Sequence, residues 1–312
     1  AEGRLYCFGG GKPPGVDGHG AKRDEKTRTE PIDRDSLAED ILERTGVDEG
    51  YCLVLGAGDG RLVQDLVSGS ELHVIVLEPD EDRVEGARQW FDASGLYGTR
   101  VHVVKGDITS LELAPYMANL IVARDVPRGD GRAEDLVENV VGTLRPYGGT
   151  ACLATTETRH ETVAASERLK QGDLSVSRAD GLTLLKRSGA LLGSDDWTHE
   201  AGTPANTYSN AENLAKPPFG VLWFGGSLDS GWPQQDFTHT RPPRPPVSRG
   251  RMFYIVFDRL HAVDIYTGRR LWSRSLQESA KTEARRQGHF IARRATADNF
   301  IATPDVLYAI RR

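Results

Sequence analysis

The chain has 312 residues, 38% of them hydrophobic and 27% charged, which is the composition of an ordinary folded protein with enough length for two domains. Its net charge of −6 is unevenly spread: residues 241–312 carry 15 Lys and Arg against 6 Asp and Glu, so a basic end follows an acidic body. No apolar run approaches the ~20 residues of a membrane helix, and the N-terminus lacks the basic and apolar regions of a signal peptide, so we expect neither feature.

The N-terminal end predicts one strand followed by a linker. Residues 3–9 (GRLYCFG) alternate as a strand does but have no local partner, so this strand must pair with something distant. Residues 10–31 are polar, charged and rich in Gly and Pro, which is typical of a linker. The cysteines Cys7, Cys52 and Cys152 have no spacing typical of a zinc or haem site, and we expect no metal. Two of them fall in predicted strands, which favours buried structural thiols.

Helices and strands alternate from residue 36 to residue 187. Ser36 and Glu39 form a capping box that predicts a helix ending near Gly46. The expected strands are residues 52–55, 73–77, 101–104, 120–123 and 150–154. The further expected helices are residues 61–67, 82–93, 132–144 and 157–170. An expected hairpin joins residues 174–177 to residues 182–186. This order indicates a parallel sheet covered on both faces, with an antiparallel edge, that binds ligands at the carboxyl ends of its strands.

After residue 189 the helical patterning gives way to β structure. Aromatic and β-branched runs at residues 221–224, 252–257 and 261–265 are separated by Gly, Pro and Asn, which predicts antiparallel strands. The Pro-rich residues 241–247 (RPPRPPV) are interpreted as a stiff spacer in preference to a ligand for an SH3-like domain. The arginines of this region are scattered and accompany no binding motif, which favours a solvated surface over a nucleic-acid site.

The three glycines in residues 51–60 (YCLVLGAGDG) indicate a nucleotide site. A predicted strand stops at Gly56, Gly58 and Gly60, and a predicted helix follows. Glycine adopts conformations closed to residues with a Cβ and lets a ligand approach the backbone, while the helix N-terminus suits an anionic or polar group. A dinucleotide fingerprint, G-x-G-x-x-G, would place its third glycine where Arg61 stands, which counts against NAD.

The GxGxG pattern resembles motif I of class I S-adenosylmethionine-dependent methyltransferases. Glu78, at the end of the second strand, matches the acidic residue that in this family holds the ribose hydroxyls, a task that suits a carboxylate because it accepts two hydrogen bonds. Asp107 matches the residue that receives the adenine amino group, and residues 119–125 occupy the position that faces the methyl group. The resemblance covers residues 36–187 and implies an α/β, Rossmann-like sheet of seven mostly parallel strands.

The resemblance also implies a set of site residues. Asp125 is the candidate base or acceptor contact, although a plain loop residue is an equal alternative. Asp59 is expected to cap the helix or to contact the methionine amino group of the cofactor. Simpler roles stay open beside these: a tight turn for the glycines, a helix N-terminal charge for Glu78 and a turn cap for Asp107. The implied cofactor-binding residues are Gly56, Ala57, Gly58, Asp59, Gly60, Glu78, Pro79, Gly106, Asp107, Ile108 and Ala123.

Residues 262–272 (AVDIYTGRRLW) fit the pattern A-x-D-x-x-x-G-x-x-x-W, which resembles the blades of PQQ-binding-like β-propellers. In such a blade Ala262 allows close packing, Asp264 and Gly268 make a turn, and the ring of Trp272 docks between blades. Residues 196–210 resemble the segment that opens such propellers, and the stretches at 3–9, 250–257 and 305–311 look like single blade strands. Because a ring needs ~4 to 8 blades, residues 189–312 imply only a partial all-β propeller module.

These resemblances divide the chain into a propeller strand at residues 1–9, a linker at 10–31, a methyltransferase-like domain at 32–188 and incomplete propeller blades at 189–312. The leading hypothesis is an enzyme that binds S-adenosylmethionine and methylates an acceptor, with the propeller contributing substrate or protein-partner contacts. The alternatives are a non-catalytic propeller scaffold with a degenerate methyltransferase domain, and a PQQ-dependent dehydrogenase. The resemblances point to different compartments, since S-adenosylmethionine is cytoplasmic while such propellers are commonly exported.

Overall fold

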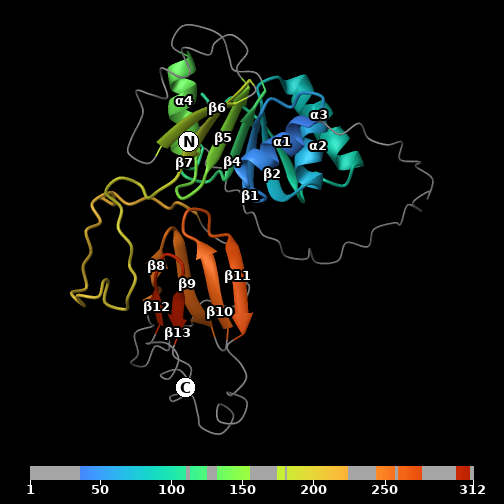
Figure 1. Ribbon diagram of the computed structural model, residues 1–312. Helices are drawn as coiled ribbons and strands as arrows, with labels where there is room; N and C mark the ends of the chain where they lie inside the picture. The colour runs from blue at the N-terminus through green and yellow to red at the C-terminus, as the bar shows by residue number, and fades with distance from the viewer. Residues whose placement is uncertain are drawn as a thin grey trace.

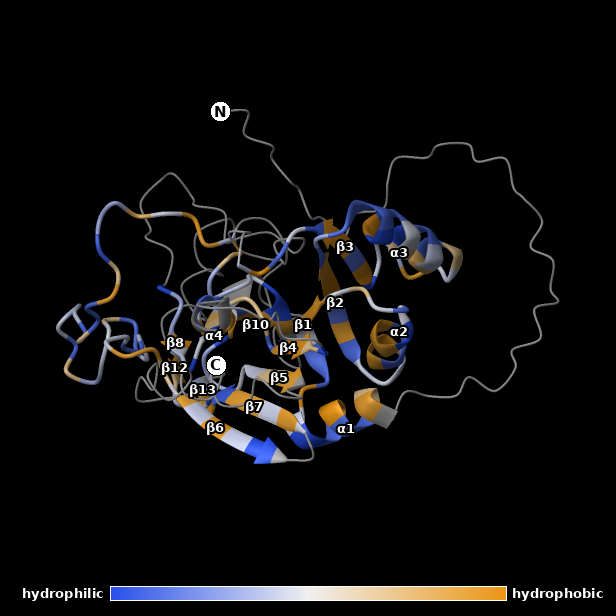
Figure 2. Cartoon of the chain, turned by 90° about the horizontal axis from the view of Figure 1, so that it is seen from above, coloured by the Kyte–Doolittle hydropathy of each residue, from blue (hydrophilic) through white to orange (hydrophobic). Residues whose placement is uncertain are grey.

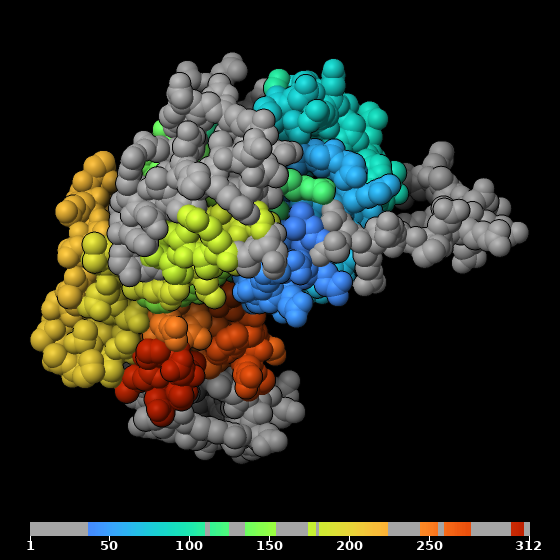
Figure 3. All heavy atoms as spheres, turned by 45° about the horizontal axis from the view of Figure 1, so that its top comes forward, coloured from blue at the N-terminus to red at the C-terminus, as the bar shows by residue number. Residues whose placement is uncertain are grey.

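The computed structural model describes residues 36–109, 113–124, 132–154, 174–179, 181–223, 244–256, 259–275 and 300–309. We call residues 36–187 the α/β body and residues 244–309 the β module; the two lie against each other (Figures 1 and 3). The strand expected at residues 3–9, the linker at 10–31 and the helix at 157–170 fall outside the described residues. In the described part of the chain, no helix is long and apolar enough to cross a membrane.

The α/β body contains one seven-stranded sheet. Its order is β3-β2-β1-β4-β5-β7-β6, in which β1 to β5 are parallel while β7 runs antiparallel to β5 and β6 antiparallel to β7. This confirms the predicted sheet and its hairpin edge. The strands are β1 (Glu49–Leu55), β2 (Glu71–Glu78), β3 (Val101–Lys105), β4 (Leu120–Ala123), β5 (Thr150–Ala154), β6 (Leu174–Ala179) and β7 (Leu182–Arg187).

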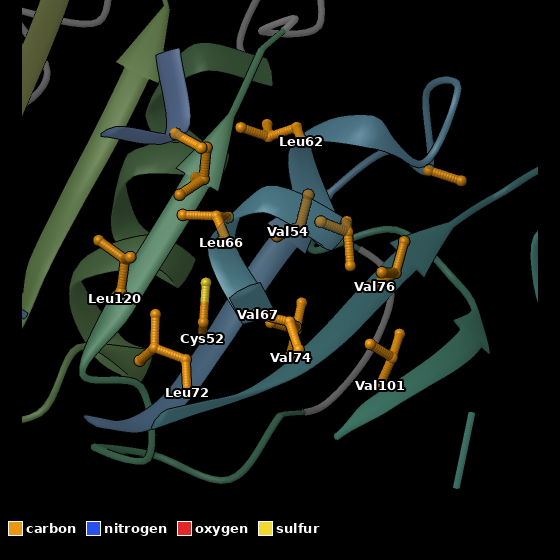
Figure 4. Packing of buried hydrophobic residues seen from close by; sticks show 14 of the residues in the cluster. Cys52, Val54, Leu62, Leu66, Val67, Leu72, Val74, Val76, Val101 and Leu120 are labelled. Carbon is orange, nitrogen blue, oxygen red and sulfur yellow. The ribbon is translucent and has the colours of Figure 1, made fainter. Parts of the chain in front are cut away.

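Four described helices cover the two faces of this sheet. Along β1, Cys52 and Val54 face α1, α2 and α3, whereas Leu53 belongs to the core under α4, as the two-residue period of a strand requires. Figure 4 shows the first of these cores, and in Figure 2 apolar residues gather along one side of α2. The helices are α1 (Ser36–Thr45), α2 (Arg61–Ser68), α3 (Glu81–Ala93) and α4 (Arg132–Thr143).

Two of the three cysteines lie inside this sheet. Cys52 on β1 and Cys152 on β5 are both fully buried, as predicted. Burial raises the pKa of the Cys52 thiol and raises that of Cys152 to about 12, so neither forms a thiolate at neutral pH. Both are packing residues.

The β module contains a four-stranded antiparallel sheet, β11-β10-β9-β8, and a two-stranded sheet, β12-β13. Strands β9 and β10 confirm the predictions at residues 252–257 and 261–265. The prediction at 221–224 is wrong for residues 221–223, which are not in a strand: the indole of Trp223 covers Gly268 and donates a hydrogen bond to the Ile265 carbonyl (2.7 Å). The strands are β8 (Val247–Ser248), β9 (Arg251–Val256), β10 (Arg259–Asp264), β11 (Arg270–Ser275), β12 (Phe300–Ala302) and β13 (Leu307–Ala309).

The β module packs against the amino ends of the parallel strands. On the body side the contacting residues begin β1 or lie just before β4 and β5, and we call this side of the sheet the amino edge. These contacts therefore lie opposite the carboxyl ends of the strands. The contacts are a buried ion pair of Arg145 with Asp264, two hydrogen bonds of Arg269 to Glu49 (3.2 Å each), and an edge-to-face ring contact of Tyr116 with Tyr266 (centroids 5.7 Å apart).

Candidate functional site

The glycine turn, residues 56–60, joins β1 to α2. All three glycines have positive φ angles, +89° at Gly56, +57° at Gly58 and +82° at Gly60. The Gly60 amide donates to the Ala57 carbonyl (3.1 Å), which closes the turn, and the Gly56 amide donates to the Leu77 carbonyl at the end of β2 (2.8 Å). Left-handed angles at three positions within five residues explain why glycine stands at each of them.

The three glycines have different surroundings. A Cβ at Gly56 or Gly58 would meet nothing within 4 Å, so the backbone at these two positions faces open space. A Cβ at Gly60 would lie only 2.8 Å from the ring of Trp90. The first two glycines therefore leave room for a ligand against bare backbone, while the third accommodates a side chain of the protein itself.

Glu78 is a buried carboxylate at the end of β2, with 3% of its surface exposed. Its Oε2 accepts a hydrogen bond from the Ala57 amide (2.8 Å) and its Oε1 one from the Asp80 amide (3.2 Å). A carboxylate offers about four lone-pair positions, so these two bonds leave acceptor capacity for hydroxyl donors of a ligand. Glu78 thus places a carboxylate acceptor directly beside the glycine turn, which is the arrangement expected of a residue that binds ribose hydroxyls.

The ends of β3 and β4 meet at the same edge of the sheet. The Gly106 amide donates to the Glu78 carbonyl (3.0 Å), and Ala123, buried at the end of β4, pairs with Leu55 directly before the glycine turn. Ile108 is buried and belongs to the core under α4, and Pro79 is exposed. The fold thus brings together residues from β1, β2, β3 and β4 that are far apart in the sequence.

Two predicted carboxylates take local hydrogen bonds. Asp107 Oδ1 accepts from both the amide and the hydroxyl of Thr109 (2.7 Å each), which is the turn-capping geometry. Exposed Asp59 accepts from the Arg61 amide (3.2 Å), although the N-cap of α2 is Gly60. Asp125, the predicted base, lies outside the described residues. Within the described ranges, no group of three or more His, Cys, Asp or Glu could hold a metal ion.

Comparison with known proteins identifies this α/β body. Residues 52–148 match the family model of the methyltransferase domain. The matched range contains the whole glycine turn and the carboxyl ends of β1 to β4. The chain carries a methyltransferase domain. A search of curated proteins found no match to the chain.

Solved structures similar to the methyltransferase domain have low sequence identity to it. A candidate S-adenosyl-L-methionine-dependent methyltransferase from Methanococcus maripaludis is 18% identical with a TM-score of 0.43, over 50% of this chain and 84% of that one. A SAM-dependent methyltransferase from Aquifex aeolicus is 16% identical (TM-score 0.39, 48% and 87%). A candidate sarcosine dimethylglycine methyltransferase from Galdieria sulphuraria is 15% identical (0.39), and the match covers 46% of this chain and 62% of that chain.

Sequence reasoning missed one residue beside the glycine turn of the methyltransferase domain. Trp90 lies on α3, where its spacing is that of an ordinary amphipathic helix, and nothing in the pattern indicates a contact with Gly60. This contact depends on how α3 packs against the turn, which no local sequence pattern contains.

Proposed function

We propose that Gly56, Gly58 and Glu78 form the contact surface for S-adenosylmethionine, and that the chain transfers the cofactor's methyl group to an acceptor held near the end of β4. The observation that carries this proposal is open space over two left-handed glycines beside a buried carboxylate with acceptor capacity to spare. Ala57, Asp59, Pro79, Gly106, Asp107, Ile108 and Ala123 would border the bound cofactor.

When bound, the cofactor supplies an electrophilic methyl group on a positively charged sulfur. The chain's own part is to bind and orient: Glu78 holds two hydroxyls, and the turn backbone excludes water from one side of the ligand. The residues near the end of β4 would hold the acceptor in line with this methyl group. We assign to Asp125 the role of orienting the acceptor or taking its proton.

Calorimetry with S-adenosylmethionine tests this assignment. Gly58→Val places a branched side chain in the open space, and Glu78→Ala removes the acceptor, so each variant should lose cofactor binding. Gly46→Val is the matched control, because Gly46 also has a positive φ (+63°) and open space around it but ends α1 away from the turn. Binding should survive in this control at wild-type affinity. Failure of the wild-type chain to bind, or retention of binding by both site variants, would contradict the proposal.

We also propose that the β module is part of a larger β-propeller. Four antiparallel strands are the blade unit of that architecture. Residues of the blade pattern have matching local roles: Ala262 is fully buried, and Asp264 accepts hydrogen bonds from the Tyr266 and Gly268 amides (both 2.8 Å). A structure of the protein encoded by the whole gene should contain a ring of such sheets; a β module closed by itself would contradict this. A scaffold without catalysis would bind the cofactor but methylate no acceptor.

A further inference from the structure

The ring of Trp90 covers the third glycine of the turn. A Cβ built on Gly60 would lie 2.8 Å from Cζ3 and 2.9 Å from Cε3 of this ring, distances at which real Cβ atoms are not found. The ring is in turn held by Phe91, which is fully buried and meets it edge to face with the centroids 4.9 Å apart. Trp90 itself remains 37% exposed. A large, partly exposed aromatic ring is thus placed on the backbone of the turn.

The same β2–α3 unit also holds the turn at two other points. The Leu77 carbonyl accepts from the Gly56 amide, and the Glu78 carboxylate accepts from the Ala57 amide (2.8 Å each). Trp90 adds a contact at the far end of the turn, where Gly60 begins α2. One structural unit therefore fixes the beginning, the second residue and the end of the turn, and it leaves open the space at Gly56 and Gly58.

We propose that Trp90 is a positioning residue for S-adenosylmethionine. By covering Gly60, its ring restricts this glycine to the left-handed conformation that starts α2, and so holds the turn in the shape that receives the cofactor. Glycine is the residue with the most conformational freedom to lose, and a loop that is already ordered loses less entropy when a ligand binds. This inference rests on the proposed cofactor site and adds a residue that makes no contact with the ligand.

Cofactor affinity in three variants separates positioning from general stability. Trp90→Ala should raise the Kd for S-adenosylmethionine about tenfold, and Trp90→Phe, which keeps a ring, should stay within about threefold of wild type. Val101→Ala is the matched control: it truncates a fully buried residue of the same core, at the amino end of β3 and away from the turn. It should lower the melting temperature while leaving the Kd unchanged.

Each outcome of this experiment decides between the two claims. If the wild-type chain binds S-adenosylmethionine and Trp90→Ala binds it with the same Kd, the role of Trp90 is overturned. The proposed function then still stands. Equal weakening by Val101→Ala overturns the role of Trp90 as well, because the loss would then follow from reduced stability. If the wild-type chain does not bind S-adenosylmethionine, the proposed function fails and this inference fails with it.

A second measurement tests the contact itself without any ligand. Gly60→Ala introduces both left-handed strain and a clash with the Trp90 ring, and only the clash disappears when Trp90→Ala is also present. The shift in denaturation midpoint caused by Gly60→Ala should therefore be smaller in the Trp90→Ala background than in wild type. Equal shifts in the two backgrounds would overturn the proposed restraint on Gly60.

Discussion

His261 on β10 is a buried histidine whose side chain makes no hydrogen bond to the described residues. It is 1% exposed, its ring stacks on Tyr254 with the centroids 5.1 Å apart, and neither ring nitrogen has a hydrogen-bond partner among the described residues. Burial, and secondarily the charges of Arg270 and Arg259, lower the pKa of His261 below its ordinary value of 6.5. The folded protein therefore holds this side chain in its neutral form at pH values where the unfolded chain is already protonated.

This histidine should make the protein sensitive to acid. As pH falls below about 6.5 the unfolded state binds a proton that the folded state resists, so stability should fall with pH until the lowered folded pKa is passed. His73 and His102 also have lowered pKa values, chiefly through burial, and act in the same direction. His261→Phe keeps the stacked ring but cannot bind a proton. The melting temperature of this variant relative to wild type should therefore rise as pH falls from 7 to 5. Parallel curves for the two proteins over this range would contradict the prediction.

The contact between the α/β body and β10 depends on one buried ion pair. The side chains of Arg145 and Asp264 are 10% and 2% exposed, and Asp264 also accepts from the Tyr266 amide (2.8 Å). The blade pattern predicted the turn made by Asp264, but not this pair, because its partner lies in another domain. Removal of one member leaves the other charge buried and uncompensated, which is more costly than the net gain from the intact pair.

Asp264→Ala should lower the free energy of unfolding by about 3–5 kcal/mol, as denaturation curves would measure. Asp264→Asn keeps an oxygen for the Tyr266 amide and should cost less. Glu49→Ala breaks the more exposed pair with Arg269 and should cost about 0–1 kcal/mol. Cofactor affinity should be unchanged in all three variants, since the pairs lie at the amino edge; a loss of affinity in Asp264→Asn would show that the two ends of the sheet are coupled.

The sequence predicted correctly those elements whose hydrophobic pattern follows from burial alone. The strands of the parallel sheet are buried on both faces and form continuous apolar runs, so they were found with errors only at their ends, such as residues 49–51 of β1. The run at residues 221–223 failed because Trp223 uses its indole to contact the 265–268 turn, a long-range contact that no local pattern contains. Glu78 was predicted as a site residue through resemblance, whereas the contact of Trp90 with the turn depends on how α3 packs and has no local pattern.

At the scale of the whole molecule, the two ends of the sheet have different neighbours. The glycine turn, Glu78 and the ends of β3 and β4 gather at the carboxyl edge, and the contacts with the β module gather at the amino edge. The contact of β10 with the body lies on the opposite side of the sheet from the glycine turn, and substrate contacts from the β module stay a prediction.

Hydrogen exchange should reveal this division. Addition of S-adenosylmethionine should slow exchange at the glycine turn and at residues 78–84, because a bound ligand reduces local opening there. Exchange in β9, β10 and β11 should stay the same, as measured by mass spectrometry of peptides with and without cofactor. Protection that extends into β10 would mean that cofactor binding is transmitted across the sheet.

The position of the β module also has a consequence for access. Because β9, β10 and β11 lie against the amino edge, they do not stand in the path of a molecule that approaches the carboxyl ends of β1 and β4. These strands therefore set no upper limit on the size of the methyl acceptor. A bulky molecule would therefore reach the carboxyl ends of β1 and β4 without displacing these three strands.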